Sequence, residues 1–281
     1  MTREIARCSR MGVAPLHEVR LEFMHPDEIA AERSRNSIAY LPIGSLEWHG
    51  PHLPFGVDAL RAHEIAVQCA QRTGGIVLPP IWWGCERPRS PEMLEAIGLP
   101  PSACVYGMDF PSNAVRSFYI REEILEALVR DVLRLLHENG FRIVVIINGH
   151  GAECQVALLQ RLVEDVNRHG MMRAIYVFPS VPDERGEYNW GHADKEETAV
   201  MMALYPELVR LERLPPKPQS LRNVDHAIVD DATFRLNPTS DHTVHPDCDP
   251  RDATPQIGEE NINRTVERIC KLVAGALSET H

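Results

Sequence analysis

The sequence lacks the features that would assign it to a membrane, a secretory route or a nucleic acid. None of its 281 residues belongs to an apolar run of about eighteen, so we expect no transmembrane helix. The first residues, Met1 to Cys8, lack the apolar core of a signal peptide. The formal net charge of −11 disfavours partners that attract a basic surface, such as nucleic acids and anionic membranes. We therefore expect a cytoplasmic protein with neither kind of partner.

The cysteines also lack the pattern of a disulfide framework or a structural zinc site. Their number, seven, is odd, and no two of them form a Cys-x-x-Cys motif. They are scattered along the chain at Cys8, Cys69, Cys85, Cys104, Cys154, Cys248 and Cys270. This pattern favours free thiols in a reducing compartment.

What the sequence does contain is an alternation of short apolar runs and amphipathic stretches. The runs predict strands over 38–43, 76–82, 142–148 and 173–178, and the amphipathic stretches predict helices over 59–72, 121–139, 153–169 and about 259–277. Continuous β-branched strands separated by helices indicate a mostly parallel sheet covered on both faces, an α/β fold. The economical interpretation is one domain over residues 1–281.

Three parts of that domain are expected to be irregular. Residues 1–22 form an N-terminal extension, and 84–117 and 213–256 form elaborated loops rich in proline. Loops of this length usually carry function, for example as lids or walls of binding sites.

Three dense polar segments each follow a predicted strand. They are GSLEWHGPHLPFGVD from Gly44, INGHGAE from Ile147 and WGHADKEETAVMM from Trp190. Because ligand sites gather beyond the carboxyl ends of parallel strands, we expect six side chains to meet there: Glu47, His49, Asp58, His150, His192 and Glu197. The glycines on both sides of His150 are expected to let the backbone turn sharply.

A mixed set of carboxylates and imidazoles predicts Zn²⁺, Mn²⁺ or Fe²⁺. Sites made only of oxygen ligands favour Mg²⁺ or Ca²⁺, and thiolates favour structural zinc. Glu47 and His49 are two residues apart, so in extended backbone they point to the same side. Six ligands exceed the need of one tetrahedral ion, whereas two ions that share a carboxylate would use them all.

Taken singly, these residues also have simpler explanations. Asp58 can be the N-cap of a helix, and His150 can support other ligands. Glu196 and Glu197 can be acidic simply because the helix dipole stabilises negative charge in the first turn of a helix. Among the other histidines only His52 has an expected role, as a support for a ligand. The joint occurrence at three strand ends favours the metal site.

The segment LPIGSLEWHGPHLPFGVD resembles the signature of the creatininase (creatinine amidohydrolase) family. NGHGAE, FPSNAVRSFYI, HADKEET and DPRDATPQIG resemble further family motifs in the same order, so the resemblance covers about residues 36–275. It implies an α/β/α sandwich and a homo-oligomer, commonly a hexamer built from dimers. It also implies ligand roles: Glu47, Asp58 and His150 for one ion, His49, Asp58 and a further glutamate for a second, and His192 as the catalytic histidine.

Two positions depart from the family pattern. Creatininase has a glutamate where this chain has Ala152, and a tryptophan where this chain has Tyr188, with Trp190 close by. The second ion must therefore take its carboxylate from Glu153 or Glu197. A shift of one helical residue rotates a side chain by about 100°, so Glu153 is expected to point away from the place that Ala152 faces. We favour Glu197, which fills the glutamate of the family's Glu-Thr-Ser pattern.

These features predict metal-dependent hydrolysis of a C–N amide bond in a small, cyclic substrate, by a hydroxide held between two divalent ions roughly 3.5 Å apart. His192 is expected to move a proton from water to the leaving nitrogen. Loop 84–117, with Trp82 and Trp83 at its root, is expected to close the site. Two alternatives stay open: C–C hydrolysis of a cyclic ketone such as an inosose, and a non-catalytic protein that binds a metal or a small ligand.

Overall fold

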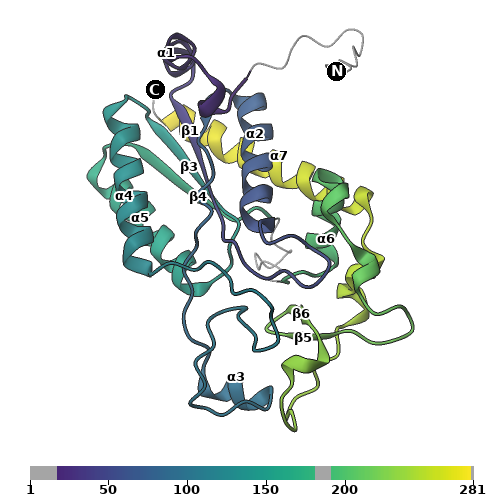
Figure 1. Ribbon diagram of the computed structural model, residues 1–281. Coiled ribbons are helices and arrows are strands. Elements are labelled where there is room, and N and C mark those ends of the chain that lie inside the picture. Colours follow the sequence, from purple (N-terminus) through teal and green to yellow (C-terminus); the bar gives the residue numbers. More distant parts are fainter. Residues whose placement is uncertain (1–17, 181–190, 280–281) are drawn as a thin grey trace, which may run out of the picture.

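A four-stranded parallel sheet forms the centre of the protein (Figure 1). The computed structural model describes residues 18–180 and 191–279. Its main strands are β1 (Ile38–Ile43), β2 (Ile76–Val77), β3 (Ile143–Asn148) and β4 (Arg173–Val177), in the spatial order β2-β1-β3-β4. Every neighbouring pair is parallel, and the β1–β3 pairing runs from Ile38 opposite Ile143 to Ile43 opposite Asn148. The predicted parallel sheet is confirmed.

Helices cover both faces of this sheet. On one face lie α4 (Glu122–Glu138) and α5 (Glu153–His169), and on the other lie α2 (Val57–Thr73) and α7 (Pro255–Glu279) (Figure 1). Strand side chains alternate between the two layers: Leu41 and Ile146 belong to the core with α4 and α5, and Tyr40 and Val145 to the core with α2 and α7. The predicted α/β/α sandwich is therefore confirmed.

The strand order creates a topological switch point between β1 and β3. After β1 the chain runs through α2 to β2, and it reaches β3 from α4 on the opposite face. The carboxyl ends of β1 and β3 therefore lie at the position where ligands bind in open parallel sheets.

Two glycines allow the first turn of α2 to lie directly against these strand ends. A Cβ at Gly44 or Gly149 would collide with the backbone of Asp58 and, at Gly44, of Ala59. Neither Gly149 nor Gly151 is among the glycines with positive φ. Residues 149–152 also form neither a turn nor a bend, so the sharp turn expected beside His150 is wrong. At Gly149 a glycine is required because the backbone of Asp58 packs closely against it.

The predicted strand over 76–82 is shorter than expected, since β2 ends at Val77. Pro79 and Pro80 follow, and a prolyl nitrogen has no hydrogen to donate to a neighbouring strand. The chain pairs with β1 again only through an isolated bridge between Ile81 and Ile43.

The two elaborated loops contain regular elements and pack on each other. Loop 84–117 includes α3 (Pro91–Ala96), and 213–256 includes a hairpin of β5 (Arg222–Val224) and β6 (Ala227–Val229). An ion pair of 3.2 Å joins Arg89 Nη1 to Asp225 Oδ2. A small apolar core also joins the loops, formed by Leu94, Ile97, Leu99, Val105, Met108 and Phe110 with Val224, Ala227 and Val229. The loops lie together beyond the carboxyl ends of β1, β3 and β4 (Figure 1).

Shorter elements complete the described chain. They are α1 (Pro26–Arg35), α6 (Lys195–Leu204) and the 3₁₀ turns Leu21–Phe23, Pro206–Leu208, Leu211–Arg213, Asp231–Thr233, Pro246–Cys248 and Pro250–Asp252.

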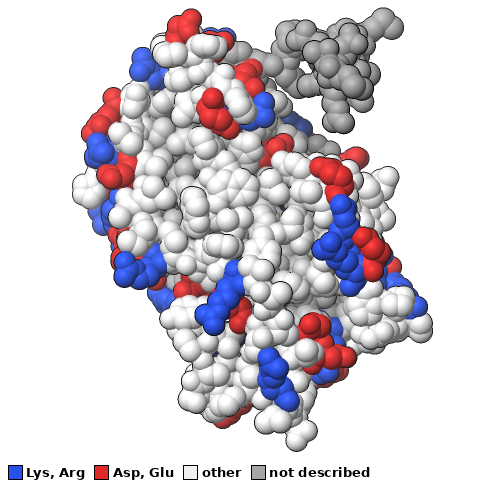
Figure 2. Space-filling view, in the orientation of Figure 1, with Lys and Arg blue, Asp and Glu red and all other residues white. Residues whose placement is uncertain are grey.

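Among the helices described, none has the length and apolarity to span a bilayer. The six described cysteines are free thiols, and Cys8 lies outside the described residues. In the view of Figure 2, charged side chains of both signs lie in small groups around a broad uncharged area.

Candidate metal centre

Six ionisable side chains converge at the switch point. Glu47 and His49 follow β1, Asp58 lies in the first turn of α2, and His150 follows β3. His192 lies just before α6, and Glu197 lies in the first turn of that helix. Five of them are at most 6% exposed, and His192 is half-buried. Their ligand atoms lie within 4.8 Å of one another in three overlapping groups: Glu47–Asp58–His150, His49–Asp58–Glu197 and Glu47–His49–His192. The structure thus places together all six residues predicted from the sequence.

Asp58 lies between the first two groups. Its Oδ1 is 3.1 Å from His49 Nε2, and its Oδ2 is 3.2 Å from His150 Nδ1. Oδ2 is buried and takes part in no hydrogen bond within the described chain. The N-cap position of α2 is Gly56, with no side-chain cap. The simpler explanation of Asp58 as an N-cap is therefore wrong.

Each of the three imidazoles has one nitrogen next to a backbone carbonyl. The distances are 3.1 Å from His49 Nδ1 to Glu47 O, 3.2 Å from His150 Nε2 to Cys85 O, and 2.6 Å from His192 Nε2 to Trp48 O. A carbonyl only accepts hydrogen bonds, so the nitrogen beside it carries the proton. The second nitrogen then faces the carboxylates, and when it is not protonated it offers them no hydrogen but can offer a lone pair to a cation, which is the arrangement of metal-binding histidines.

The electrostatics of the cluster favour added positive charge. Burial lowers the pKa of His49, but the carboxylates of Glu197 and Asp58 outweigh burial and raise it to about 10. Burial also opposes protonation of His150, and Glu47 and Asp58 again raise its pKa well above the ordinary range. Three buried carboxylates and three imidazoles that each direct one ring nitrogen inward therefore fit a divalent cation, which would take the place of those protons.

Glu197, and not Glu153, is the glutamate that belongs to the second group. Glu197 is 6% exposed, and its Oε2 lies 3.8 Å from His49 Nε2 and accepts a hydrogen bond of 2.7 Å from Ala193 N–H. Glu153 is an exposed first residue of α5, and Glu196 is exposed as well. The geometry agrees with the preference for Glu197, whose role as a metal ligand stays a prediction.

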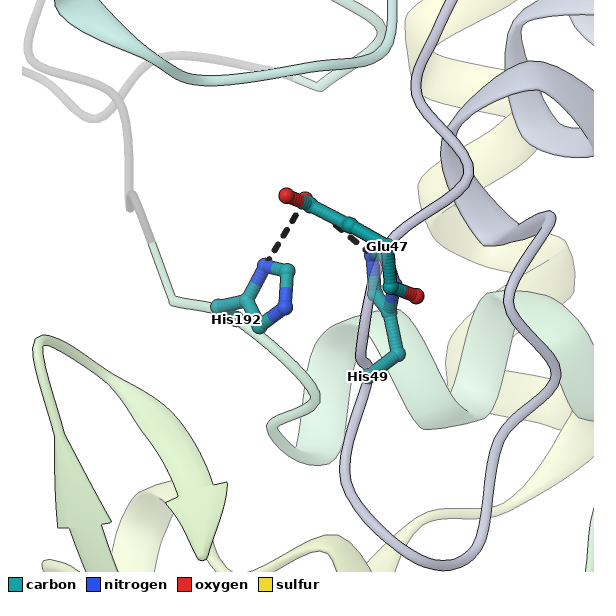
Figure 3. A group of neighbouring side chains, drawn as sticks. All are labelled: Glu47, His49 and His192. Carbon is teal, nitrogen blue, oxygen red and sulfur yellow. Dashed lines mark hydrogen bonds and ion pairs between the residues drawn. The ribbon is translucent and has the colours of Figure 1, made fainter. Parts of the chain in front are cut away.

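His192 faces Glu47 across the cluster. Its Nδ1 lies 3.6 Å from Glu47 Oε1, and its ring centroid is 4.0 Å from that of His49. Figure 3 shows the imidazole of His192 and the carboxylate of Glu47 directed toward each other. Tyr188 and Trp190, expected near this histidine, lie outside the described residues.

Several polar supports of the cluster were not predicted from the sequence. Tyr119 Oη donates to Glu47 Oε2 at 2.6 Å, Asn148 Nδ2 donates to the His150 carbonyl at 2.7 Å, and Gln155 Nε2 donates to Asn148 Oδ1 at 2.8 Å. Asn148 was visible as the polar end of an apolar strand, but Tyr119 and Gln155 leave no signal in residue spacing. His52, the one expected support, lies 2.9 Å from the hydroxyl of Thr198, the neighbour of Glu197.

Comparison with known proteins agrees with this geometry. The family model of creatininase, described as creatinine amidohydrolase, matches residues 22–273. The chain is 26% identical over 203 residues to the 3-dehydro-scyllo-inosose hydrolase of Thermotoga maritima, and this match covers 69% of this chain and 58% of the relative. It is also 26% identical over 197 residues to the creatinine amidohydrolase of Pseudomonas putida, and this match covers 64% of this chain and 69% of the relative. The match thus spans less than two thirds of the first relative's length.

Solved structures share the fold. A crystal structure of creatinine amidohydrolase (creatininase) superposes with a TM-score of 0.64 at 24% identity, over 92% of this chain and 97% of the other. Identity at this level shows the fold alone.

Proposed function

The chain belongs to the creatininase family, and from this premise we propose that it is a metal-dependent hydrolase of a C–N amide bond in a small cyclic substrate. One observation carries the proposal: Asp58 is shared by two buried groups, and in each of them an imidazole nitrogen faces the carboxylates. The name of the Pseudomonas putida relative, creatinine amidohydrolase, supports the amide bond as the target.

Two cation positions follow from the two groups. Glu47, Asp58 and His150 would hold one ion, and His49, Asp58 and Glu197 would hold the other. Mixed nitrogen and oxygen ligands suit Zn²⁺ or Mn²⁺, and also Fe²⁺. Solved creatininases described as a manganese form and as a zinc–zinc type support the first two. Divalent ions in such a site polarise a carbonyl oxygen and lower the pKa of a water molecule.

His192 is placed to carry a proton. Its Nε2–H is held by the Trp48 carbonyl, so Nδ1 has the lone pair and faces the cluster beside Glu47. We assign to this nitrogen the transfer of a proton from water to the leaving nitrogen of the substrate.

The two elaborated loops would confine the substrate. Trp48 Nε1 donates to the Ile228 carbonyl of β6 at 3.2 Å, and His192 forms an isolated bridge with Ala227 of the same strand. The hairpin is therefore tied to the segments that carry the cluster, and loop 84–117 packs on the hairpin. Water exclusion by this wall would strengthen electrostatic interactions inside. A cytoplasmic location and a homo-oligomer, such as a hexamer, stay predictions.

A second candidate is C–C hydrolysis of a cyclic ketone. It is favoured by the name of the Thermotoga maritima relative, an inosose hydrolase. Ala152, where creatininase has glutamate, also separates this chain from the amide-cleaving enzyme. The same carboxylates and imidazoles would hold the divalent ions that polarise the ketone oxygen.

Turnover by protein of defined metal content tests the proposal. The protein is dialysed against a strong chelator, reloaded with Zn²⁺ or Mn²⁺, and assayed on lactams, formamides and inososes. We expect a cyclic amide to be hydrolysed only by the reloaded protein. Turnover of inososes alone would favour the second candidate, and metal binding without turnover on the whole panel would favour a non-catalytic protein. Full activity of metal-free protein would contradict both hydrolytic mechanisms.

A further inference from the structure

A tyrosine outside the predicted ligand set touches the cluster directly. Tyr119 Oη lies 2.6 Å from Glu47 Oε2, and the Met108 backbone nitrogen lies 3.1 Å from the same hydroxyl. A backbone N–H can only donate, so the hydroxyl accepts from Met108 and directs its own proton to Glu47. One of the two carboxylate oxygens of Glu47 therefore accepts a hydrogen bond from the phenol group of Tyr119.

The other oxygen of Glu47 faces the imidazoles. Its Oε1 lies 3.1 Å from His150 Nδ1, 3.6 Å from His192 Nδ1 and 3.9 Å from His49 Nε2. Two of these contacts, with His49 and His192, are drawn in Figure 3. The last torsion of a glutamate side chain is broad, so an unrestrained carboxylate can turn both oxygens to a cation. The bond to Tyr119 removes that freedom.

Glu47 depends on such a bond more than the other carboxylates of the cluster. Asp58 and Glu197 lie in the first turns of α2 and α6, so a helix orients each of them. Glu47 lies in the irregular segment after β1, where its backbone N–H donates to the Phe55 carbonyl at 3.0 Å. We propose that Tyr119 is a positioning residue that holds Glu47 with one oxygen toward the cations.

The segment that carries Tyr119 also connects the cluster to the elaborated loop 84–117. Met108, the donor to Tyr119, belongs to that loop and to its apolar core. The neighbouring Phe118 N–H donates to the Leu46 carbonyl at 2.8 Å. The Tyr119 ring lies nearly parallel to that of His150, at 5.9 Å between centroids and 28° between planes. Tyr119 thus contacts two predicted ligands of one cation while the loop holds its hydroxyl.

The variant Tyr119→Phe tests this role, because it removes the hydroxyl and keeps the ring. The inference rests on the proposed function, since it requires a cation at the cluster. Co²⁺ is the probe: chelator-treated protein is titrated with Co²⁺, and both the dissociation constant and the visible absorption bands of the bound ion are recorded. We expect the variant to bind Co²⁺ roughly 10–100-fold more weakly, the range found for groups that orient metal ligands. We also expect altered bands, because Glu47 then offers both oxygens.

Tyr40→Phe is the matched control. Tyr40 is a buried tyrosine of β1 whose hydroxyl lies 2.5 Å from Thr73 Oγ1, away from the cluster. Its loss removes one buried hydrogen bond and is expected to lower stability while the Co²⁺ affinity and spectrum stay unchanged. Wild-type affinity and bands in Tyr119→Phe overturn the inference alone. Failure of the wild-type protein to bind Co²⁺ overturns the proposed function, and the inference with it.

Discussion

The two ends of the sheet hold buried carboxylates in opposite circumstances. At the amino end, Glu32 is 3% exposed and accepts hydrogen bonds from Gly75 N–H at 2.6 Å, Arg35 Nη2 at 2.6 Å and Asn36 Nδ2 at 3.1 Å. At the carboxyl end, Asp58 is 2% exposed, and its Oδ2 takes part in no hydrogen bond within the described residues. The two carboxylates are almost equally buried, but only Glu32 has protein hydrogen-bond donors on both of its oxygens.

This difference separates a structural carboxylate from one that we propose as a cation ligand. Burying a charge is costly unless it is paired and hydrogen-bonded. Protein donors offset that cost for Glu32, which joins α1 to the start of β2. Asp58 has imidazoles for neighbours, and these offset its charge only when they are protonated. A divalent cation would compensate the charge of Asp58 while the imidazoles stay neutral.

Removal of the shared carboxylate should have the largest effect. In Asp58→Asn the side chain keeps its shape but loses its charge, so both groups lose a ligand. We expect metal content to fall sharply and turnover to drop to the level of chelator-treated protein. Metal analysis of the purified variant, with turnover measured beside it, checks this expectation. Two ions retained with normal turnover would remove Asp58 from the site.

Loss of His192 should be the next largest effect. If its Nδ1 carries the proton, His192→Ala keeps its metals and loses about 10²–10⁴-fold in turnover. Metal content and turnover at saturating substrate are measured on the same sample. Loss of an ion from this variant would instead make His192 a ligand, in line with its grouping with Glu47 and His49.

The two candidate glutamates allow a matched pair of variants. Glu197→Gln should lose one ion, since Glu197 is buried beside His49. Glu153→Gln should keep both ions, because Glu153 is exposed at the start of α5. Metal stoichiometry distinguishes the two, and the reverse pattern would transfer the ligand role to Glu153.

The smallest effect on the metals is expected at the amino end. Glu32→Gln weakens three charge-assisted hydrogen bonds, so the free energy of unfolding should fall by about 1–3 kcal/mol. Metal content and turnover should stay at wild-type values, because Glu32 lies at the opposite end of the sheet. Denaturant unfolding together with metal analysis measures both quantities. A variant that keeps its stability and loses metal would invalidate the comparison between the two ends.

The sequence predicted the sheet and its covering helices well because their signal is periodic. The helix expected over 153–169 has those bounds, and that expected over 121–139 spans Glu122–Glu138. The hairpin β5–β6 was not predicted. Its strands have three residues each, and its turn places Asp225 and His226 at positive φ. The pair Asp225–His226 lacks the glycine of the usual asparagine–glycine and aspartate–glycine turns, and the hairpin packs against loop 84–117.

The candidate ligands were predictable because each lies at a strand end within a dense polar motif. The choice between Glu153 and Glu197 followed from helical rotation and the family pattern, and the exposure of Glu153 agrees with it. Most of the supports were not predictable. Tyr119 reaches Glu47 across 72 positions of the chain, and the Cys85 carbonyl that holds His150 is a backbone group with no sequence signal.

Anomalous diffraction from crystals grown with Zn²⁺ or Mn²⁺ tests the central claim most directly. The account predicts two peaks on either side of Asp58, one facing Glu47 and His150 and the other facing His49 and Glu197. A map with no peak among these five residues, from a protein that is active, would contradict it.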